Sequence, residues 1–156
     1  MSERTASAAG APPWVTVFTP IAKLLLAARV PLGFNGLITI RGRKSGLPRT
    51  TPVAIIDVSG RRWIWAPWGE VQWVRNLRAA GRATIMFRRR EEEVTATELD
   101  QTQRAEFFRD VMGPLARSFP LGVSLVRIVD GVDLNHPAEV AVDRRVFELN
   151  RARSND

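Results

Sequence analysis

The chain has 156 residues and a net charge of +7, with 45% apolar and 25% charged residues. These proportions suit one soluble globular domain and exclude a fibrous or largely disordered chain. The sequence has no cysteine and one histidine, His136, which argues against thiolate chemistry, a zinc site and a Ser-His-Asp triad, so no metal is assigned. The basic excess favours a polyanionic partner: nucleic acid, anionic lipid, or a phosphorylated and carboxylated cofactor.

Residues 1–13 are small and polar and predict a disordered N-terminal lead, followed by a single domain over residues 14–156. Apolar residues recur every three or four positions between Trp14 and Arg29, which predicts an amphipathic helix. This stretch contains Pro20 and Lys23, is too short to span a bilayer and lacks a cleavage site. We expect a cytoplasmic protein whose N-terminal helix covers the domain, with peripheral contact to the inner face of the membrane as the alternative.

Three strands are predicted in the first half of the chain. The alternating segment "GLITIRG" is the first, "RTTPVAIIDVSG" the second and "GRRWIWAPW" the third. Turns at Ser45-Gly46 and Ser59-Gly60 are too short for parallel crossovers, so the three strands form an antiparallel meander.

A short helix is predicted next for "EVQWVRNLRAAG", with Gly81 as its C-terminal stop. The segment "RATIMFRRREEEVTATELD" predicts two more strands, with "RRREEE" at their turn or on a solvated edge. Trp63 and Trp65 share one face of the third strand, which favours a place in the core. Trp73 is equally compatible with packing and with a pocket.

The last part of the chain predicts a helix that ends at Met112, where Gly113-Pro114 interrupts it. An Asn-capped helix in "NHPAEVAVDRR" and a closing strand in "VFELN" follow. The fold class is therefore α+β, mainly β, with about six antiparallel strands in a small barrel covered by helices.

The segment "GRKSGLPRTTP" carries the strongest functional signal. Arg43, Lys44 and Arg49 surround a turn that Gly46 and Pro48 make rigid, so their charges project from a fixed frame toward an anionic group. A solvated basic turn is the alternative. The segment "WVRNLRAAGRATI" follows the third strand and changes the balance between the two interpretations.

This combination resembles the deazaflavin (coenzyme F420)-dependent nitroreductase and quinone reductase family, whose members are split β-barrels. The family has a "GRKTG-x-PR-x-x-P" hairpin, a third strand and then a "W-x-x-N-L-x-A" helix. The matching residues here are Gly42, Arg43, Lys44, Ser45, Gly46, Pro48, Arg49 and Pro52, followed by Trp73, Asn76, Leu77 and Ala79. The resemblance covers about residues 37–98.

The resemblance implies that Lys44 and Arg49, with Arg43 beside them, bind the phosphate and acidic tail of F420, and that backbone near Pro52 faces the deazaflavin. The segment after the third strand would line the cofactor, and Trp73 and Asn76 would support that wall. The residues of this segment are Ala66, Pro67, Trp68 and Gly69.

Two departures from the family pattern concern the ligands. The family often has a lysine in the 66–69 segment, where this chain has Trp68, so one anion contact is missing. Relatives use tyrosines near the end of the chain to bind substrate, and this sequence has no tyrosine. Ser118, Phe119 and Ser124 are candidates for their places, and catalytic residues remain unassigned.

The function implied by the resemblance is hydride transfer from reduced F420 to a hydrophobic electron acceptor such as a quinone, an enone or a nitro compound. A split barrel that binds flavin mononucleotide (FMN) or another anion in the same groove is the alternative. A nucleic-acid-binding module is less favoured, because only the charge supports it and no reading motif is present. We expect a monomer or homodimer with no specific nucleic-acid partner.

Overall fold

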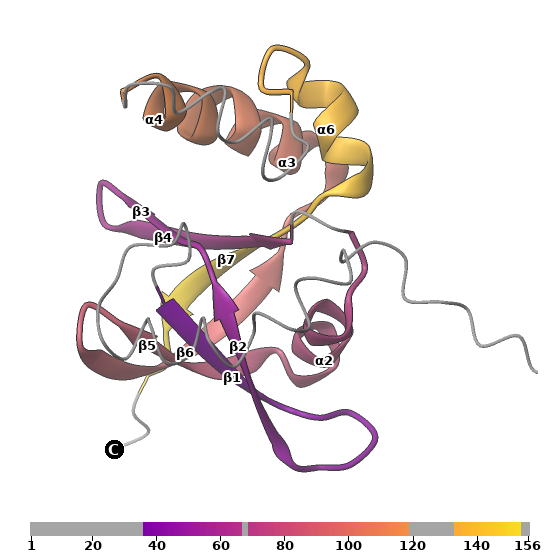
Figure 1. The fold of residues 1–156 in the computed structure, drawn as a ribbon, viewed down its shortest axis with the longest axis vertical. Helices are drawn as coiled ribbons and strands as arrows, with labels where there is room; N and C mark the ends of the chain where they lie inside the picture. Colours follow the sequence, from indigo (N-terminus) through magenta and orange to yellow (C-terminus); the bar gives the residue numbers. More distant parts are fainter. Residues whose placement is uncertain (1–35, 67–68, 119–132, 154–156) are drawn as a thin grey trace, which may run out of the picture.

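The computed structural model describes residues 36–66, 69–118 and 133–153. The expected lead over residues 1–13 and the expected helix between Trp14 and Arg29 lie outside the described residues. The described part is a curled antiparallel sheet with helices around it (Figure 1).

The sheet has seven strands in the order β2-β1-β5-β6-β7-β4-β3, and neighbouring strands are antiparallel. The strands are β1 (Gly36–Arg41), β2 (Pro48–Val53), β3 (Ile55–Val58), β4 (Arg61–Ala66), β5 (Arg82–Phe87), β6 (Arg90–Glu98) and β7 (Arg145–Arg151). The mainly β, antiparallel fold class predicted from the sequence is confirmed.

The two outermost strands of this order, β2 and β3, are consecutive in the chain, with only Ala54 between them. The apolar run predicted as one second strand is therefore two strands, which pair with β1 on one edge and with β4 on the other. This split explains why the sheet has seven strands. It also makes the sheet curl, because its two edges are covalently joined.

The inner face of the curled sheet holds the main core. Alternate residues of the strands point inward, including Ile38, Ile40, Val53, Ile55, Ile64, Ile85, Val94, Phe147 and Leu149. Helix α2 (Gln72–Ala80) adds Val74 and Leu77 to this core and ends at Gly81, whose φ of 66° is the left-handed conformation expected of a glycine stop. The core thus fixes α2 against β1, β5 and β6.

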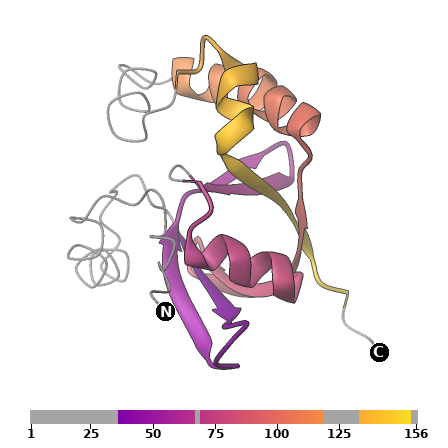
Figure 2. The ribbon, with the colours of Figure 1, turned by 90° about the vertical axis from the view of Figure 1, so that its right-hand side faces the viewer.

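A helical layer packs on the other side of β3 and β4, away from α2 (Figure 2). It consists of α3 (Gln101–Phe107), the π-helical segment η1 (Phe108–Met112), α4 (Gly113–Arg117) and α6 (Pro137–Asp143). Trp63 lies 5.6 Å from the ring of Phe107, and Trp65 lies 5.6 Å from that of Phe108, so both tryptophans are core residues as predicted.

The helix predicted to stop at Met112 continues to Arg117, so that part of the prediction is wrong. Gly113 keeps helical angles, and its N–H donates to the Phe108 carbonyl, five residues back. The wider π turn accommodates Pro114, which has no N–H to donate and would crowd a carbonyl four residues back in a regular α-helix.

Candidate functional site

The basic loop, residues 42–47 between β1 and β2, holds its own shape through internal hydrogen bonds. The Gly42 N–H donates to the Leu47 carbonyl at 2.8 Å, and the Gly46 N–H donates to the Gly42 carbonyl at 2.8 Å. Gly46 has a φ of 69°, in the region that favours glycine. A Cβ on Gly42 would lie 2.7 Å from the Ser45 Oγ, so a larger residue there would have to displace this hydroxyl, which accepts from the Leu47 N–H. The rigid turn predicted from the sequence is present.

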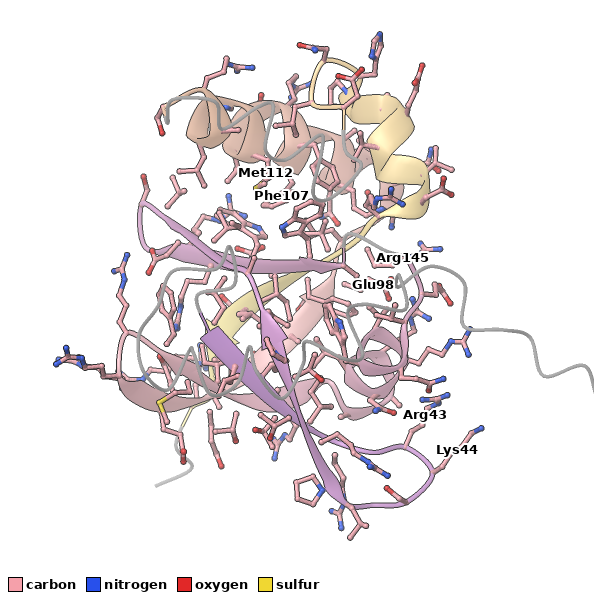
Figure 3. The ribbon with its side chains drawn as sticks, viewed as in Figure 1. Arg43, Lys44, Glu98, Phe107, Met112 and Arg145 are labelled. Carbon is pink, nitrogen blue, oxygen red and sulfur yellow. The ribbon has the colours of Figure 1, made fainter. Side chains whose placement is uncertain are left out.

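Lys44 and Arg49 are exposed on this hairpin, and their side chains form no hydrogen bond or ion pair with another described residue. Lys44 points outward from the end of the loop (Figure 3). Arg49 lies opposite Ile40 of β1 and therefore on the face of the hairpin that turns toward the core and α2. Their charges are not neutralised within the described part of the chain, and they are available to an anion.

Arg43 differs from these two because its side chain is held by α2. Its Nη1 donates to the Asn76 Oδ1 at 2.8 Å and to the Gln72 Oε1 at 3.0 Å. Its backbone N–H also donates to the Asn76 Oδ1, at 3.2 Å. Asn76 is buried, so α2 presents a largely solvent-shielded acceptor to the loop.

Helix α2 is in turn anchored by an ionic network centred on Arg78. Its guanidinium bonds Glu98 of β6 at 2.6 Å and Glu70 at 3.0 Å, and Arg145 of β7 reaches Glu70 at 3.3 Å. The hydrogen bond from Arg78 lowers the pKa of Glu98 and that of Glu70, and the two carboxylates raise the pKa of Arg78. Arg78 is therefore an exposed ion-pair partner that ties α2 to β6.

The other expected cofactor residues that the structure describes lie on β2, at the end of β4 and at the start of α2. Pro52 is buried on β2, and Ala66 is buried at the end of β4. Gly69 has a φ of 75°, and its carbonyl accepts from the Val71 N–H that precedes α2. Trp73 is half-buried, and its ring lies 6.3 Å from that of Phe147, which favours packing. Pro67 and Trp68 lie outside the described residues.

The hairpin and the segment before α2 therefore approach the same helix, because Arg43 contacts Gln72, three residues after Gly69. The expectation from the sequence included neither the hydrogen bond from Arg43 to Gln72 nor the direct bonds between Asn76 and the loop. The one local signal in the sequence is that Gln72 and Asn76 are polar and four residues apart on α2, but this spacing does not identify Arg43 as their partner. An open depression between the loop and the end of α2 is lined by Arg41, residues 42–46, Ala79 and Ala80.

Two kinds of feature are absent from the described ranges 36–66, 69–118 and 133–153. No three histidine, aspartate or glutamate side chains there gather as metal ligands. No helix there is long and apolar enough to cross a membrane.

Solved structures with the same fold define the class of the protein as a split-barrel-like domain. HutZ, the heme storage protein from Vibrio cholerae, has a TM-score of 0.52 at 14% identity, with 86% of this chain and 90% of HutZ covered. A putative 5-nitroimidazole antibiotic resistance protein from Bacteroides thetaiotaomicron has a TM-score of 0.51 at 10% identity, covering 86% of this chain and 79% of that protein. A protein described as a domain-swapped dimer has a TM-score of 0.50 at 16% identity, covering 88% and 97%. These identities establish the fold alone.

The sequence itself identifies the family. The F420H(2)-dependent quinone reductase family matches residues 26–118, which is more than half of the chain. The chain belongs to this family and is an F420-dependent reductase, so the cofactor expected from the hairpin motif is confirmed. No curated protein matches the sequence.

Proposed function

We propose that this reductase transfers a hydride to a quinone, an enone or a nitro-type acceptor, with Lys44 and Arg49 binding the anionic part of F420. When bound, reduced F420 supplies the hydride from C5 of its deazaflavin ring. The protein must then anchor the phosphate and acidic tail, expose one ring face and exclude water. Because the cofactor supplies the hydride, the protein itself needs no pair of acid and base side chains for this step.

The observation that carries the proposal is an unneutralised basic hairpin. Residues 36–56 include Arg41, Arg43, Lys44 and Arg49 and contain no aspartate or glutamate. The loop between the strands is fixed by its internal hydrogen bonds, so the lysine and arginine need little further ordering to bind an anion. A phosphate with a carboxylated tail matches this donor set, since arginine and lysine both bind phosphate and arginine binds carboxylate bidentately.

The ring would lie beyond the hairpin, along the start of α2. We assign Pro52, Ala66, Pro67, Trp68 and Gly69 to its lining, with Trp73 and Asn76 supporting them. Gly69 suits this place because its φ of 75° allows a turn that most side chains would strain. The assignment is tested by variants of Gly69 and Trp73 that change the absorbance of the bound deazaflavin without changing thermal stability.

F420 should bind in preference to FMN, because several separate cations fit a long polyanionic tail better than a single phosphate. The measurement is a fluorescence titration of the purified protein with each oxidised cofactor. Equal or reversed affinities would contradict the preference. The acceptor class follows from steady-state rates with a quinone, an enone and a nitroaromatic compound, each driven by reduced F420.

Lys44→Ala and Arg49→Ala are the decisive variants for the site. Each should weaken F420 binding by about 1.5–3 kcal/mol, the usual contribution of a hydrogen bond to a charged group, which is a tenfold loss or more. Both side chains are exposed, so thermal melting without cofactor should not change. Arg89→Ala, in the β5–β6 turn, is the matched control. An equal loss in all three variants would show a diffuse positive field and would sink the site assignment.

A further inference from the structure

The contact between Asn76 and Arg43 has the properties of a positioning device. One side-chain oxygen, the Asn76 Oδ1, accepts both the backbone N–H of Arg43 at 3.2 Å and its Nη1 at 2.8 Å. Two bonds from one residue fix both the backbone and the side chain of Arg43. The loop and the helix are thereby joined across 33 residues of sequence.

Burial explains why this acceptor depends on the loop. Asn76 is 8% exposed and lies between the core residues Val74 and Leu77 of α2. A buried amide oxygen without a partner is costly, and among the described residues the partner of this oxygen is Arg43. The helix therefore stabilises the loop in the orientation that brings Arg43 to this oxygen.

The chemistry of the acceptors preserves the charge of the loop. Gln72 and Asn76 are neutral amides, so Arg43 is held in place while its positive charge remains uncompensated. The carboxylates near α2, Glu70 and Glu98, are instead engaged by Arg78. Arg78 thus ties the helix to β6, and Arg43 ties the loop to the helix.

We propose that Arg43 and Asn76 form a latch that orients the basic loop for the anionic part of F420. Arg43 is then a positioning residue that aligns Lys44 and Arg49 rather than the main contact to the cofactor. This inference rests on the proposed role of Lys44 and Arg49. It assigns to Asn76 a specific task within the site, which is to hold the loop in the binding orientation before the cofactor arrives.

The test is a double-mutant cycle of Arg43→Ala and Asn76→Ala, read as the Kd for F420. Each single variant should weaken binding about three- to tenfold, as expected from losing one or two net hydrogen bonds. The loss in the double variant should be smaller than the product of the two single losses, because both changes remove the bond between the Arg43 Nη1 and the Asn76 Oδ1. Titrations at about 0.3 M salt reduce the contribution of long-range charge. Independent, multiplying losses would overturn the latch.

A second readout needs no cofactor. Backbone amide exchange over residues 42–47 should become faster in both single variants, while the α2 amides keep their protection. Unchanged exchange in the loop would contradict the proposal. Asn150→Ala, an exposed asparagine on β7, is the matched control and should change neither measurement. If Asn76→Ala does not fold, the cycle is run with Asn76→Leu, which has a similar shape and fills the buried position but removes the acceptor oxygen.

The two proposals fail in different ways. Should Lys44→Ala and Arg49→Ala leave F420 binding unchanged, the proposed anion site is wrong. Should they weaken binding while Arg43 and Asn76 act independently, only the latch is wrong.

Discussion

Two hairpins of this protein concentrate arginine, and they differ in the carboxylates around them. In the β1–β2 hairpin, the side chains of Lys44 and Arg49 have no partner among the described residues. Around the β5–β6 hairpin, Glu92 of β6 accepts two hydrogen bonds from Arg62 and lies 3.3 Å from Arg151. The number of cations in a segment therefore says little about binding. The carboxylates within reach decide whether a cation is structural or available.

The backbones of the two hairpins also differ. The basic loop has a glycine, Gly46, at its left-handed position. The β5–β6 turn instead places Arg88 and Arg89 in that conformation, with φ values of 49° and 66°. A residue other than glycine with such a positive φ costs about 1–2 kcal/mol relative to glycine at the same position. The β1–β2 hairpin is thus the relaxed one, and the β5–β6 hairpin carries the strain.

The largest expected effect comes from reversing one charge in each hairpin. Lys44→Glu should weaken F420 binding more than about 100-fold, because a carboxylate beside the cofactor's anionic group adds repulsion to the lost contact. Arg89→Glu should change the Kd less than about threefold, since exposed charges far from a ligand are largely screened. The measurement is a cofactor titration at physiological salt. Similar losses in both variants would remove the distinction between the hairpins.

Arg62→Gln should give the next largest effect, on stability rather than binding. The side chains of Arg62 and Glu92 are each less than a quarter exposed to solvent. Losing the two hydrogen bonds between them should therefore lower the free energy of unfolding by about 1.5–3 kcal/mol. Arg62 also lowers the pKa of Glu92, so the stabilisation is present at neutral pH and is lost as the pH falls through that lowered pKa.

Urea denaturation at neutral and acid pH measures the effect of Arg62→Gln. The neighbouring Arg61→Gln is the control, because its bond to Glu148 is solvent-exposed on the arginine side and should contribute at most about 1 kcal/mol. A difference between wild type and Arg62→Gln that persists unchanged in acid would argue against the ion pair as the cause.

The smallest effect concerns backbone strain in the β5–β6 turn. Arg89→Gly should raise the unfolding free energy by about 0.5–1 kcal/mol, because glycine adopts a positive φ without steric cost, and this gain exceeds its extra entropy in the unfolded chain. The reverse change in the basic loop, Gly46→Ala, should lower stability by a similar amount. Thermal melting of both variants checks the pair, and a stabilising Gly46→Ala would contradict the assigned conformations.

The local elements of the fold follow from the sequence, and the pairing of its edges does not. Alternation predicts β1 and β4, and Gly81 predicts the end of α2. The run from Arg49 to Val58 is a continuous β-type pattern, so no local signal shows that the chain changes sheet edge at Ala54. Likewise, Gly113-Pro114 normally ends a helix, and only the π turn before it allows the helix to continue.

The candidate site shows the same difference between what local sequence signals predict and what depends on tertiary packing. Residue types, a rigid turn and the resemblance to the family together select Lys44 and Arg49 as the proposed anion site, because charge, glycine conformation and motif spacing are local properties of the sequence. The bond from Arg43 to Asn76 joins residues far apart in the sequence, and it became visible only when α2 was placed against the hairpin. The partner of Arg78 on β6 depends on the tertiary fold in the same way.

The single residue between β2 and β3 couples the registers of two distant strand pairs. In a sheet with free edges, an outer strand can slip by one residue without disturbing the opposite edge. Here, a slip of β2 along β1 would pull β3 along β4 and exchange Ile55, which faces the inner core, with Ile56, which faces the helical layer. The apolar packing of β3 therefore also fixes the register of β2, the strand that carries Arg49 and Pro52. A conservative change at Ile55 is thereby connected to the alignment of the proposed cofactor site, although the residue itself is buried in the core.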